Sequence, residues 1–413
     1  MSSRGGRTLM AYRGGGALVS LAGLVLLTGC GGGSSSPMSG GNTPPPSTVN
    51  NVQDVTVNSG PTGNDVNMLF TSVTVCVPGT SNCQTIPNVE VDTGSEGLRI
   101  LSSALTLSLP TATDGSGNPL GNCVSFVDDS YVWGPVATAD VQLAGEKASS
   151  VPVQIIGASS FPAAPASCNS GGVALTNLAA LGANGMLGIG VFQQDCGAAC
   201  SPGMGSPPAV YFACPNSGCS VTTVALQNQL QNPVWMFPQD NNGVLISLPT
   251  VPSNGTTTVS GSLIFGIGTQ SDNALGTAQV YTTDANGDFS TTFNGTKYSG
   301  SFLDTGSNGL FFLDSSTLGI PDCTDGNSGF YCPTLTQNYT ATNTGMNGTS
   351  GSVSFSIADA DLLFGTNNAA FSNLGGSNAG SFDWGLPFYF GRNVFTAIEN
   401  QNTPAGAGPY WAY

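Results

Sequence analysis

Short segments in which apolar and polar residues alternate follow one another along most of the chain. No long stretch has the helical spacing of apolar residues, and Gly, Ser, Thr and Asn separate the segments. Alternation with a period of two is typical of strands with one buried face. The pattern therefore predicts an all-β protein with a few short helices. A length of 413 residues suits two core-bearing units better than one.

The first 29 residues have the pattern of an export signal. Three arginines, Arg4, Arg7 and Arg13, precede the apolar run "ALVSLAGLVLL" at Ala17–Leu27. That run is too short to span a bilayer, and a basic start followed by such a run is typical of a signal peptide. We therefore expect residues 1–29 to be removed on export.

The signal ends in "LTGC", which resembles the bacterial lipobox. The resemblance implies cleavage before Cys30 and lipidation of its thiol; the alternative is an ordinary signal peptide with a chance cysteine. Residues 30–51 are rich in Gly, Ser and Pro, which is typical of a flexible tether. Gly31 resembles the sorting signal of outer-membrane lipoproteins, which lack an acidic residue there. We therefore expect a lipid-anchored protein of the bacterial cell envelope, held at the outer membrane.

The ten cysteines after Cys30 form an even set in a chain that we expect to be exported. An oxidising compartment favours disulfide bonds. A zinc site is the alternative for the cluster of four cysteines between residues 196 and 219, but its spacings fit zinc poorly. We expect the near neighbours Cys76 and Cys83, and Cys323 and Cys332, to pair, with Cys123 and Cys168 as a long-range pair and the connectivity of Cys196, Cys200, Cys214 and Cys219 left open.

The charge balance is strongly acidic, with 7 basic and 23 acidic residues and a net charge of −16. Such a chain is a poor partner for nucleic acid or for an anionic membrane surface. There is no histidine, which excludes Ser-His-Asp and Cys-His nucleophiles and every His-ligated metal. The chemistry must therefore come from carboxylates, hydroxyls, amides or backbone, and we expect neither a metal nor a cofactor.

The tetrapeptide Asp-Thr-Gly-Ser occurs twice, in "VEVDTGSEGLRIL" at Val89–Leu101 and in "SFLDTGSNGLFFLD" at Ser301–Asp314. Later in each half, two apolar or aromatic residues precede a glycine, in "NGMLGIGVF" (Asn184–Phe192) and in "SFDWGLPFYFGRNVF" (Ser381–Phe395). One such tetrapeptide is an ordinary turn motif. Two copies in matching contexts indicate an internal duplication.

These motifs resemble those of the two-lobed, pepsin-like aspartic peptidases. "VDTGSEGL" and "LDTGSNGL" resemble the two active-site loops of that family, and "MLGIG" and "WGLPF" resemble the strands that thread beside them. Three further segments resemble the helix of the first lobe, the glycine-rich strand near the lobe junction, and the last helix and strand: Ala225–Phe237, Val259–Gln270 and Phe388–Glu399. The chain also resembles a bacterial group of lipoproteins of unknown function that share the "FDWGLPF" ending. The resemblance implies a bilobal fold with lobes at residues 52–273 and 274–413.

The residue types suit the chemistry that the resemblance implies. Two carboxyl groups in contact cannot both ionise, so a pair can divide the roles of acid and base. Asp92 and Asp304 are the expected catalytic pair, one from each lobe. The rest of each motif is expected to support the pair. The threonines, Thr93 and Thr305, should form hydrogen bonds across the lobe interface, and the glycines, Gly94 and Gly306, should allow close approach of the backbone. The serines, Ser95 and Ser307, should donate hydrogen bonds to the outer carboxylate oxygens.

Some positions depart from the family pattern. Arg99 stands seven residues after Asp92, where active members usually carry an aromatic residue. The flap of the family corresponds to residues 125–136, in which Tyr131 and Trp133 are the candidates for substrate contact. A core or surface position is an equally good interpretation for either ring.

Three functions are compatible with these motifs. The first is a membrane-anchored aspartic endopeptidase that binds an extended peptide between its lobes. The second is a pepsin-like protein that binds peptides or proteins without catalysis, and the third is a structural lipoprotein of the envelope. The two intact Asp-Thr-Gly-Ser motifs favour the first, since a fold alone does not determine function. We expect a monomer whose partners are a peptide or protein substrate and, through lipid on Cys30, the membrane.

Overall fold

The computed structural model describes residues 50–413 other than 170 and 325. The predicted signal peptide, Cys30 and the tether up to residue 49 lie outside the described residues. Among the described residues, no helix has the length and apolar character needed to cross a membrane.

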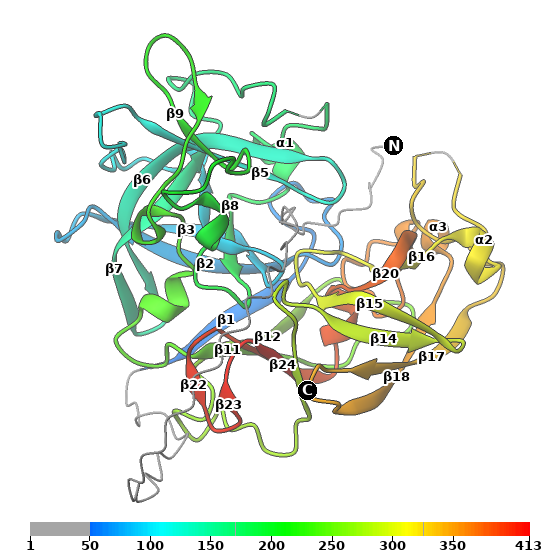
Figure 1. Cartoon of the computed structure of the whole chain (residues 1–413). Coiled ribbons are helices and arrows are strands. Elements are labelled where there is room, and N and C mark those ends of the chain that lie inside the picture. Colours follow the sequence, from blue (N-terminus) through cyan, green and yellow to red (C-terminus); the bar gives the residue numbers. More distant parts are fainter. Residues whose placement is uncertain (1–49, 170, 325) are drawn as a thin grey trace, which may run out of the picture.

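Most of the regular secondary structure in the described part of the chain is β-strand, and the strands are arranged in two lobes (Figure 1). The strands of the first lobe are β2 (Leu69–Cys76), β3 (Cys83–Asp92), β4 (Glu96–Leu101), β5 (Leu120–Ser125), β6 (Tyr131–Leu143), β7 (Glu146–Ile156), β8 (Gly185–Ile189), β9 (Tyr211–Ala213) and β10 (Ser220–Val221). Those of the second lobe are β14 (Phe289–Phe293), β15 (Thr296–Leu303), β16 (Leu310–Leu313), β17 (Gln337–Thr344), β18 (Ser350–Ile357), β19 (Gly375–Gly376) and β20 (Asn378–Trp384).

A third group of strands lies beneath and between the lobes. In spatial order it consists of β1 (Val52–Val57), β12 (Val259–Phe265), β11 (Gly243–Leu248), β21 (Arg392–Ala397), β24 (Tyr410–Ala412) and β13 (Val280–Thr282). Strands β11 and β21 pair antiparallel, with Leu245 opposite Phe395. Strands from both sides of the proposed lobe boundary at residue 273 therefore share one sheet. A small hairpin of β22 (Asn402–Thr403) and β23 (Gly406–Ala407) extends from it.

The duplication seen in the sequence is also present in the strand pairing. In the first lobe, β8 lies between β3 and β4, parallel to β3 and antiparallel to β4. In the second lobe, β20 lies in the same way between β15 and β16. Each Asp-Thr-Gly-Ser loop thus connects two strands that are separated by a third. This arrangement, with the two lobes, confirms the predicted all-β, bilobal, pepsin-like fold.

Helices are few and short, as predicted. The described residues contain α1 (Leu178–Leu181), α2 (Ser315–Leu318) and α3 (Ala360–Phe364), each capped by an Asn or Asp side chain. The expected helix at residues 225–237 is instead two 3₁₀ turns, η3 (Leu226–Asn228) and η4 (Pro233–Met236). Pro233 explains the interruption, because proline disfavours helical backbone at the residue before it and lacks an N–H. The last helix is also a 3₁₀ turn, η5 (Leu386–Tyr389), and the remaining turns are η1 (Ser102–Ala104) and η2 (Gly197–Cys200).

All ten cysteines in the described part of the chain are paired, which confirms the prediction of disulfides. The three pairs that the sequence suggested are present, and the cluster of four cysteines forms two local bridges. The bonds are Cys76–Cys83, Cys123–Cys168, Cys196–Cys200, Cys214–Cys219 and Cys323–Cys332.

Candidate active site

The two Asp-Thr-Gly-Ser loops meet at the junction of the lobes. Strand β3 ends at Asp92, and Asp304 directly follows β15. Each threading strand needs a glycine where it passes the loop, at Gly188 in β8 and at Gly385 directly after β20. A Cβ on Gly188 would lie 2.7 Å from the carbonyl carbon of Glu96, and a Cβ on Gly385 would collide with the carbonyl oxygen of Gly309. Each loop can therefore pack against its threading strand only because that position has no side chain.

The threonines join the two loops by reciprocal hydrogen bonds. The amide of Thr93 donates to Oγ1 of Thr305 over 3.1 Å, and the amide of Thr305 donates to Oγ1 of Thr93 over 3.0 Å. Each hydroxyl in turn donates to a carbonyl of the opposite strand, Thr93 to Leu303 and Thr305 to Val91. These are the bonds across the lobe interface that the sequence predicted.

Within its own loop, each aspartate accepts one amide and one hydroxyl. The amide of Gly94 donates to Oδ1 of Asp92 over 2.8 Å, and Ser95 donates to Oδ2. The amide of Gly306 donates to Oδ1 of Asp304 over 2.7 Å, and Ser307 donates to Oδ2 over 2.8 Å.

The two carboxyl groups also face each other closely. A Cβ on Gly94 would lie 2.6 Å from Cγ of Asp304, and a Cβ on Gly306 would lie 2.8 Å from Oδ1 of Asp92. Each carboxyl therefore occupies the space beside the glycine of the other loop. We call Asp92 and Asp304 the carboxyl pair.

Both members of the carboxyl pair are fully buried. Burial raises the pKa of Asp92 well above its usual value, and the negative charge of Asp304 raises it further. Burial also raises the pKa of Asp304, but hydrogen bonds from Ser307 and from Asp92 partly offset that effect. The pKa of Asp92 is therefore raised more than that of Asp304, which favours a proton on Asp92. The arrangement can thus present one ionised and one protonated carboxyl group.

The chain belongs to the DUF3443 family. The sequence profile of this family, described as a protein of unknown function, matches residues 47–413. No curated protein matches the chain in sequence. Among solved structures, the crystal structure of an aspartic proteinase from Irpex lacteus is similar with a TM-score of 0.48 and 14% identity, over 87% of this chain and 96% of that chain. The pepsin-like architecture of this DUF3443 chain rests on its own strand pairing and loops.

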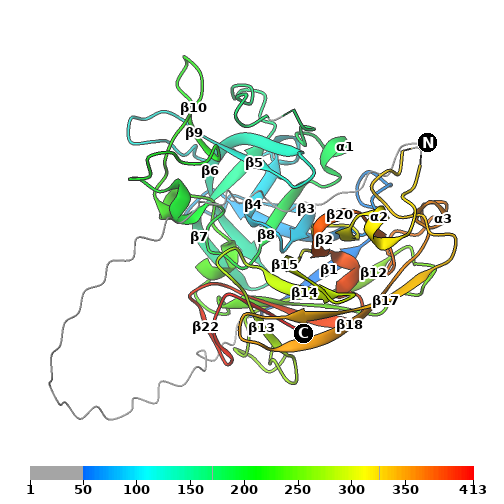
Figure 2. The same ribbon diagram turned by 45° about the vertical axis from the view of Figure 1, so that its right-hand side comes forward.

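Tyr131 and Trp133 lie in a different neighbourhood from the carboxyl pair. Both are buried in an apolar cluster with the Cys123–Cys168 disulfide and Phe212. The indole of Trp133 donates to the carbonyl of Pro162 and packs edge-on against Phe212. Strands β5 and β6 pair as a hairpin, as the flap prediction requires, but these two rings are buried in this cluster. In Figure 2, β5, β6, β9 and β10 lie together at the outer end of the first lobe.

The hairpin is also fixed by its neighbours in the sheet. Strand β5 pairs with β9, and the amide of Cys123 donates to Val210. On the other side, Tyr131 exchanges backbone hydrogen bonds with Val173 and Leu175. The candidate flap is thus one element of a larger sheet and not a free hairpin.

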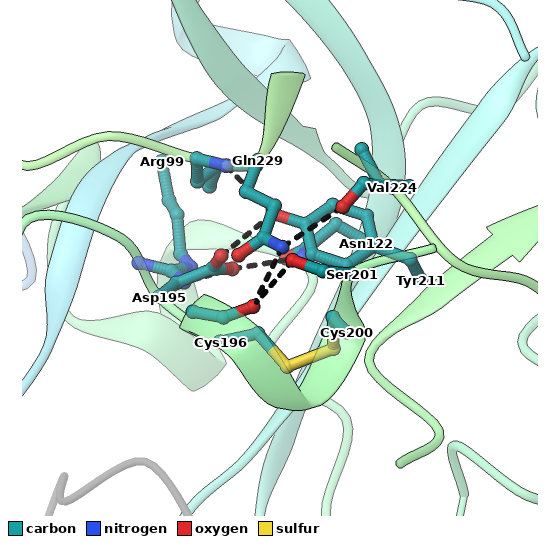
Figure 3. The surroundings of a disulfide bond; sticks show 11 residues. Arg99, Asn122, Asp195, Cys196, Cys200, Ser201, Tyr211, Val224 and Gln229 are labelled. Carbon is teal, nitrogen blue, oxygen red and sulfur yellow. Dashed lines mark hydrogen bonds and ion pairs between the residues drawn. A yellow bond between two sulfur atoms is a disulfide. The ribbon is translucent and has the colours of Figure 1, made fainter. Parts of the chain in front are cut away.

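Arg99 takes part in a buried polar network that sequence reasoning missed (Figure 3). Its guanidinium lies 3.5 Å from Asp195, which also accepts hydrogen bonds from Tyr211 over 2.6 Å and from Asn122 over 3.0 Å. Gln154 extends the network to the carbonyl of Asn122. Asp195 directly precedes the small Cys196–Cys200 loop, so the network holds that loop against β4, β5 and β9. Arg99 and Asp195 are 96 residues apart, and no motif or spacing in the sequence indicates that they pair.

Two further buried groups beside the carboxyl pair were missed as well. Asp383 of β20 shares the hydroxyl of Ser307 with Asp304. The hydroxyl of Tyr389 lies 3.0 Å from Oγ1 of Thr93. Both belong to the "FDWGLPFY" segment, whose sequence pattern predicts only a threading strand that ends in glycine.

One group of possible metal ligands exists among the described residues, formed by Cys323, Cys332 and Asp361. The two cysteines are bonded to each other, so their sulfurs are not thiolate ligands.

Proposed function

We propose that this chain is an aspartic endopeptidase that is anchored to the cell envelope by lipid on Cys30. The observation that carries the proposal is the carboxyl pair, in which two buried aspartates from equivalent loops lie within reach of each other. Reciprocal threonine bonds hold the two loops at a fixed separation. A site of this kind can perform acid–base chemistry with carboxyl groups alone, in a chain that has no histidine.

In the proposed reaction, Asp304 is the base and Asp92 the acid. Asp304 takes a proton from a water molecule, whose oxygen attacks the carbonyl carbon of the scissile peptide bond. Asp92 donates its proton toward the carbonyl oxygen as the tetrahedral intermediate forms. When the intermediate collapses and the C–N bond breaks, Asp304 gives the leaving amine the proton that it took from water. A hydroxyl group of the intermediate returns its proton to Asp92, so the carboxyl pair regains its starting state. No covalent enzyme intermediate is involved.

A cavity of about 430 Å³ lies between the two halves and reaches Glu96, directly after the first Asp-Thr-Gly-Ser loop, although neither aspartate of the carboxyl pair lines it. We propose that it receives part of an extended peptide. It is lined by Glu96, Phe192 and Asp195 from the first lobe and by Asn286 and Glu399 from the second half of the chain. Because the carboxyl pair itself is fully buried, a peptide bond can reach it only if the covering segments move. The site is therefore expected to be less active on folded proteins than on flexible peptides.

The test is cleavage of a diverse peptide library by the oxidised protein between about pH 3 and pH 7. A statine-type transition-state analogue and the Asp304→Asn variant are the controls. Turnover that both controls abolish supports the proposal, and the variant should lose at least about 100-fold in kcat, the lower range for general acid–base catalysis. Full activity in Asp304→Asn would overturn the mechanism.

A second function, peptide or protein binding without catalysis, is favoured by one specific observation. Both catalytic candidates have no exposed surface. Hydrogen bonds between Asn67 of the first lobe and the backbone of Asn308, just after the second loop, and of Phe371 also tie the two lobes together. Saturable peptide binding without turnover, unchanged in Asp304→Asn, would identify this function. The anchor is tested separately by fractionation, since a Cys30→Ala variant should leave the membrane fraction.

A further inference from the structure

A third carboxyl group lies directly beside the carboxyl pair. Asp383 is in β20, opposite Phe302 of β15 and Phe311 of β16, and its exposed fraction is 1%. Its Oδ2 lies 2.6 Å from Oγ of Ser307, whose distance to Oδ2 of Asp304 is 2.8 Å. One serine hydroxyl thus bridges two carboxyl groups.

Counting donors shows that one of these carboxyl groups carries a proton. A serine hydroxyl has one hydrogen and can donate it to only one carboxylate. If Asp304 and Asp383 were both ionised, one of the two contacts would join two acceptors with no hydrogen between them. A protonated carboxyl that donates to Oγ of Ser307 removes this conflict, because the hydroxyl then donates its own hydrogen to the other aspartate.

The surroundings indicate which aspartate is protonated. Asp304 also accepts the amide of Gly306, whereas Oδ1 of Asp383 is buried and has no hydrogen-bond partner. Neither of the ion pairs recorded for the described residues, Arg99–Asp195 and Lys147–Asp140, involves Asp383. A buried carboxylate with one oxygen unsatisfied and no cation nearby is strongly unfavourable, but a neutral carboxylic acid is not.

We propose that Asp383 is a neutral carboxylic acid that donates to Ser307, directs the serine hydrogen to Asp304, and so positions Asp304 as the ionised member of the carboxyl pair. The protonation of Asp383 stands independently of any activity, whereas its positioning role rests on the proposed function. No proton is transferred along these hydrogen bonds. Asp383 and Ser307 each keep their own hydrogen throughout the reaction.

Comparison of the lobes supports a directional role. In the first lobe, the residue two positions before Asp92 is Glu90, and it pairs with Met186 of β8. In the second lobe, the residue two positions before Asp304 is Phe302, and it pairs with Asp383 of β20. Met186 therefore occupies the position equivalent to Asp383, so that Ser95 meets no carboxyl group from β8. The two halves of the carboxyl pair differ in this way, although their loops are alike.

The other titratable groups near Asp383 are all acids. Asp304 and Asp92 raise its pKa by their charges, after burial, which has the larger effect. Tyr389 of η5 is buried close to the three aspartates and has a raised pKa, chiefly because of burial. On β3, Glu90 acts on Asp92, where its charge favours the protonated form. This distribution keeps protons on Asp92 and Asp383 and leaves the negative charge for Asp304.

The first experiment locates the proton without any assay of activity. Infrared spectra of the full-length protein in detergent, with and without ¹³C-labelled aspartate, detect buried carboxylic acids at neutral pH. We expect the carboxylic-acid signal to fall in Asp383→Asn, with the melting temperature of this variant close to that of the parent protein, because the amide still donates to Ser307. An undiminished signal in Asp383→Asn would overturn the proposal.

The second experiment tests the positioning role by the pH profile of peptide cleavage. If Asp383 is neutral, Asp383→Asn should leave the acidic limb of the profile in place. Asp383→Leu removes the hydrogen-bond donor to Ser307, so it should move that limb toward neutral pH and lower kcat about two- to tenfold. If Asp383 were ionised, Asp383→Asn would remove a negative charge and move the acidic limb to lower pH. That shift, or a Leu variant identical to the parent, would overturn the role. Absence of turnover in the parent protein would count against the proposed function, while the infrared result still decides the protonation of Asp383.

Discussion

The hydroxyl of Thr93 accepts a hydrogen bond from the amide of Thr305, and the hydroxyl of Thr305 accepts one from the amide of Thr93. The two residues are 212 positions apart and belong to different lobes. The symmetry is broken at one point, since Tyr389 contacts the hydroxyl of Thr93 but has no counterpart recorded at Thr305 among the described residues. The link between the lobes is therefore stronger on the side of Thr93.

Replacing either threonine by valine should destabilise the protein. Valine keeps the shape but leaves a buried amide and a carbonyl of the opposite loop without partners, at a cost of about 1–3 kcal/mol. Thr93→Val should cost more than Thr305→Val, because the hydroxyl of Tyr389 also loses its partner. Urea unfolding gives both values. Thr340→Val, at an exposed position of β17, is the control and should change stability by less than about 0.5 kcal/mol; equal effects in all three variants would contradict this account.

Adding one methyl group at Gly94 should disrupt the carboxyl pair. Its Cβ would lie 2.6 Å from Cγ of Asp304, so the carboxyl group or the loop must shift. We expect Gly94→Ala to lose about 1–3 kcal/mol of stability by overpacking and to lose peptide cleavage. Gly115→Ala is the matched control, since a Cβ there meets no atom within 4 Å. Wild-type unfolding and cleavage in Gly94→Ala would show that the loops are not packed as described.

The sequence predicted the parts of the site that repeat. Asp92 and Asp304 were recognisable because each is followed by the same three residues and, later, by a glycine on a threading strand. Asp383 was not recognised, because it occupies a position that is apolar in the first lobe, where Met186 stands. A duplication reveals what two lobes share, and it hides the residues by which they differ.

Contacts between distant segments account for the other differences. Arg99 departs from the family pattern in the sequence, but its partner Asp195 comes close to it only through the packing of the Cys196–Cys200 loop against β4. Tyr131 and Trp133 fall within the predicted hairpin, yet the alternation of a strand does not say which face meets the substrate. Both rings instead pack in the buried cluster with the Cys123–Cys168 bond and Phe212.

The pair of Arg99 and Asp195 should contribute strongly to stability when only one partner is removed. Both side chains are almost fully buried, at 1% and 3% exposure. Arg99→Met leaves the carboxylate of Asp195 in the interior without its cation and should cost about 3–5 kcal/mol. Asp195→Asn should leave the guanidinium uncompensated and be similarly harmful. Urea unfolding of both single variants and the double variant gives the coupling energy, and the double variant should be clearly more stable than the sum of the single effects predicts; strict additivity would show that the ion pair does not couple.

Stability should fall as the pH rises from acid toward neutral, and Glu146 should account for part of the fall. Glu146 has an exposed fraction of 2%, and burial, followed by the negative charge of Asp240, raises its pKa from 4.5 to about 7. A folded-state pKa above the unfolded value means that the folded protein binds this proton more tightly. The stabilisation is therefore complete below pH 4.5 and is lost as the pH rises through about 7, by at most roughly 3 kcal/mol. Buried Asp92, Asp304 and Asp383 act in the same direction.

The check is the free energy of unfolding in urea at several pH values between 4 and 8. Glu146→Gln carries no titrating proton, so its stability should decline less steeply than that of the parent protein, with the residual slope due to the three buried aspartates. Asp54→Asn, at an exposed position of β1, is the control and should follow the parent curve. A slope in Glu146→Gln equal to that of the parent, or a parent protein that becomes more stable between pH 4 and 8, would contradict the assigned shift. The expected direction also bears on the proposed activity, because conditions that protonate the buried acids preserve the fold in which the carboxyl pair is assembled.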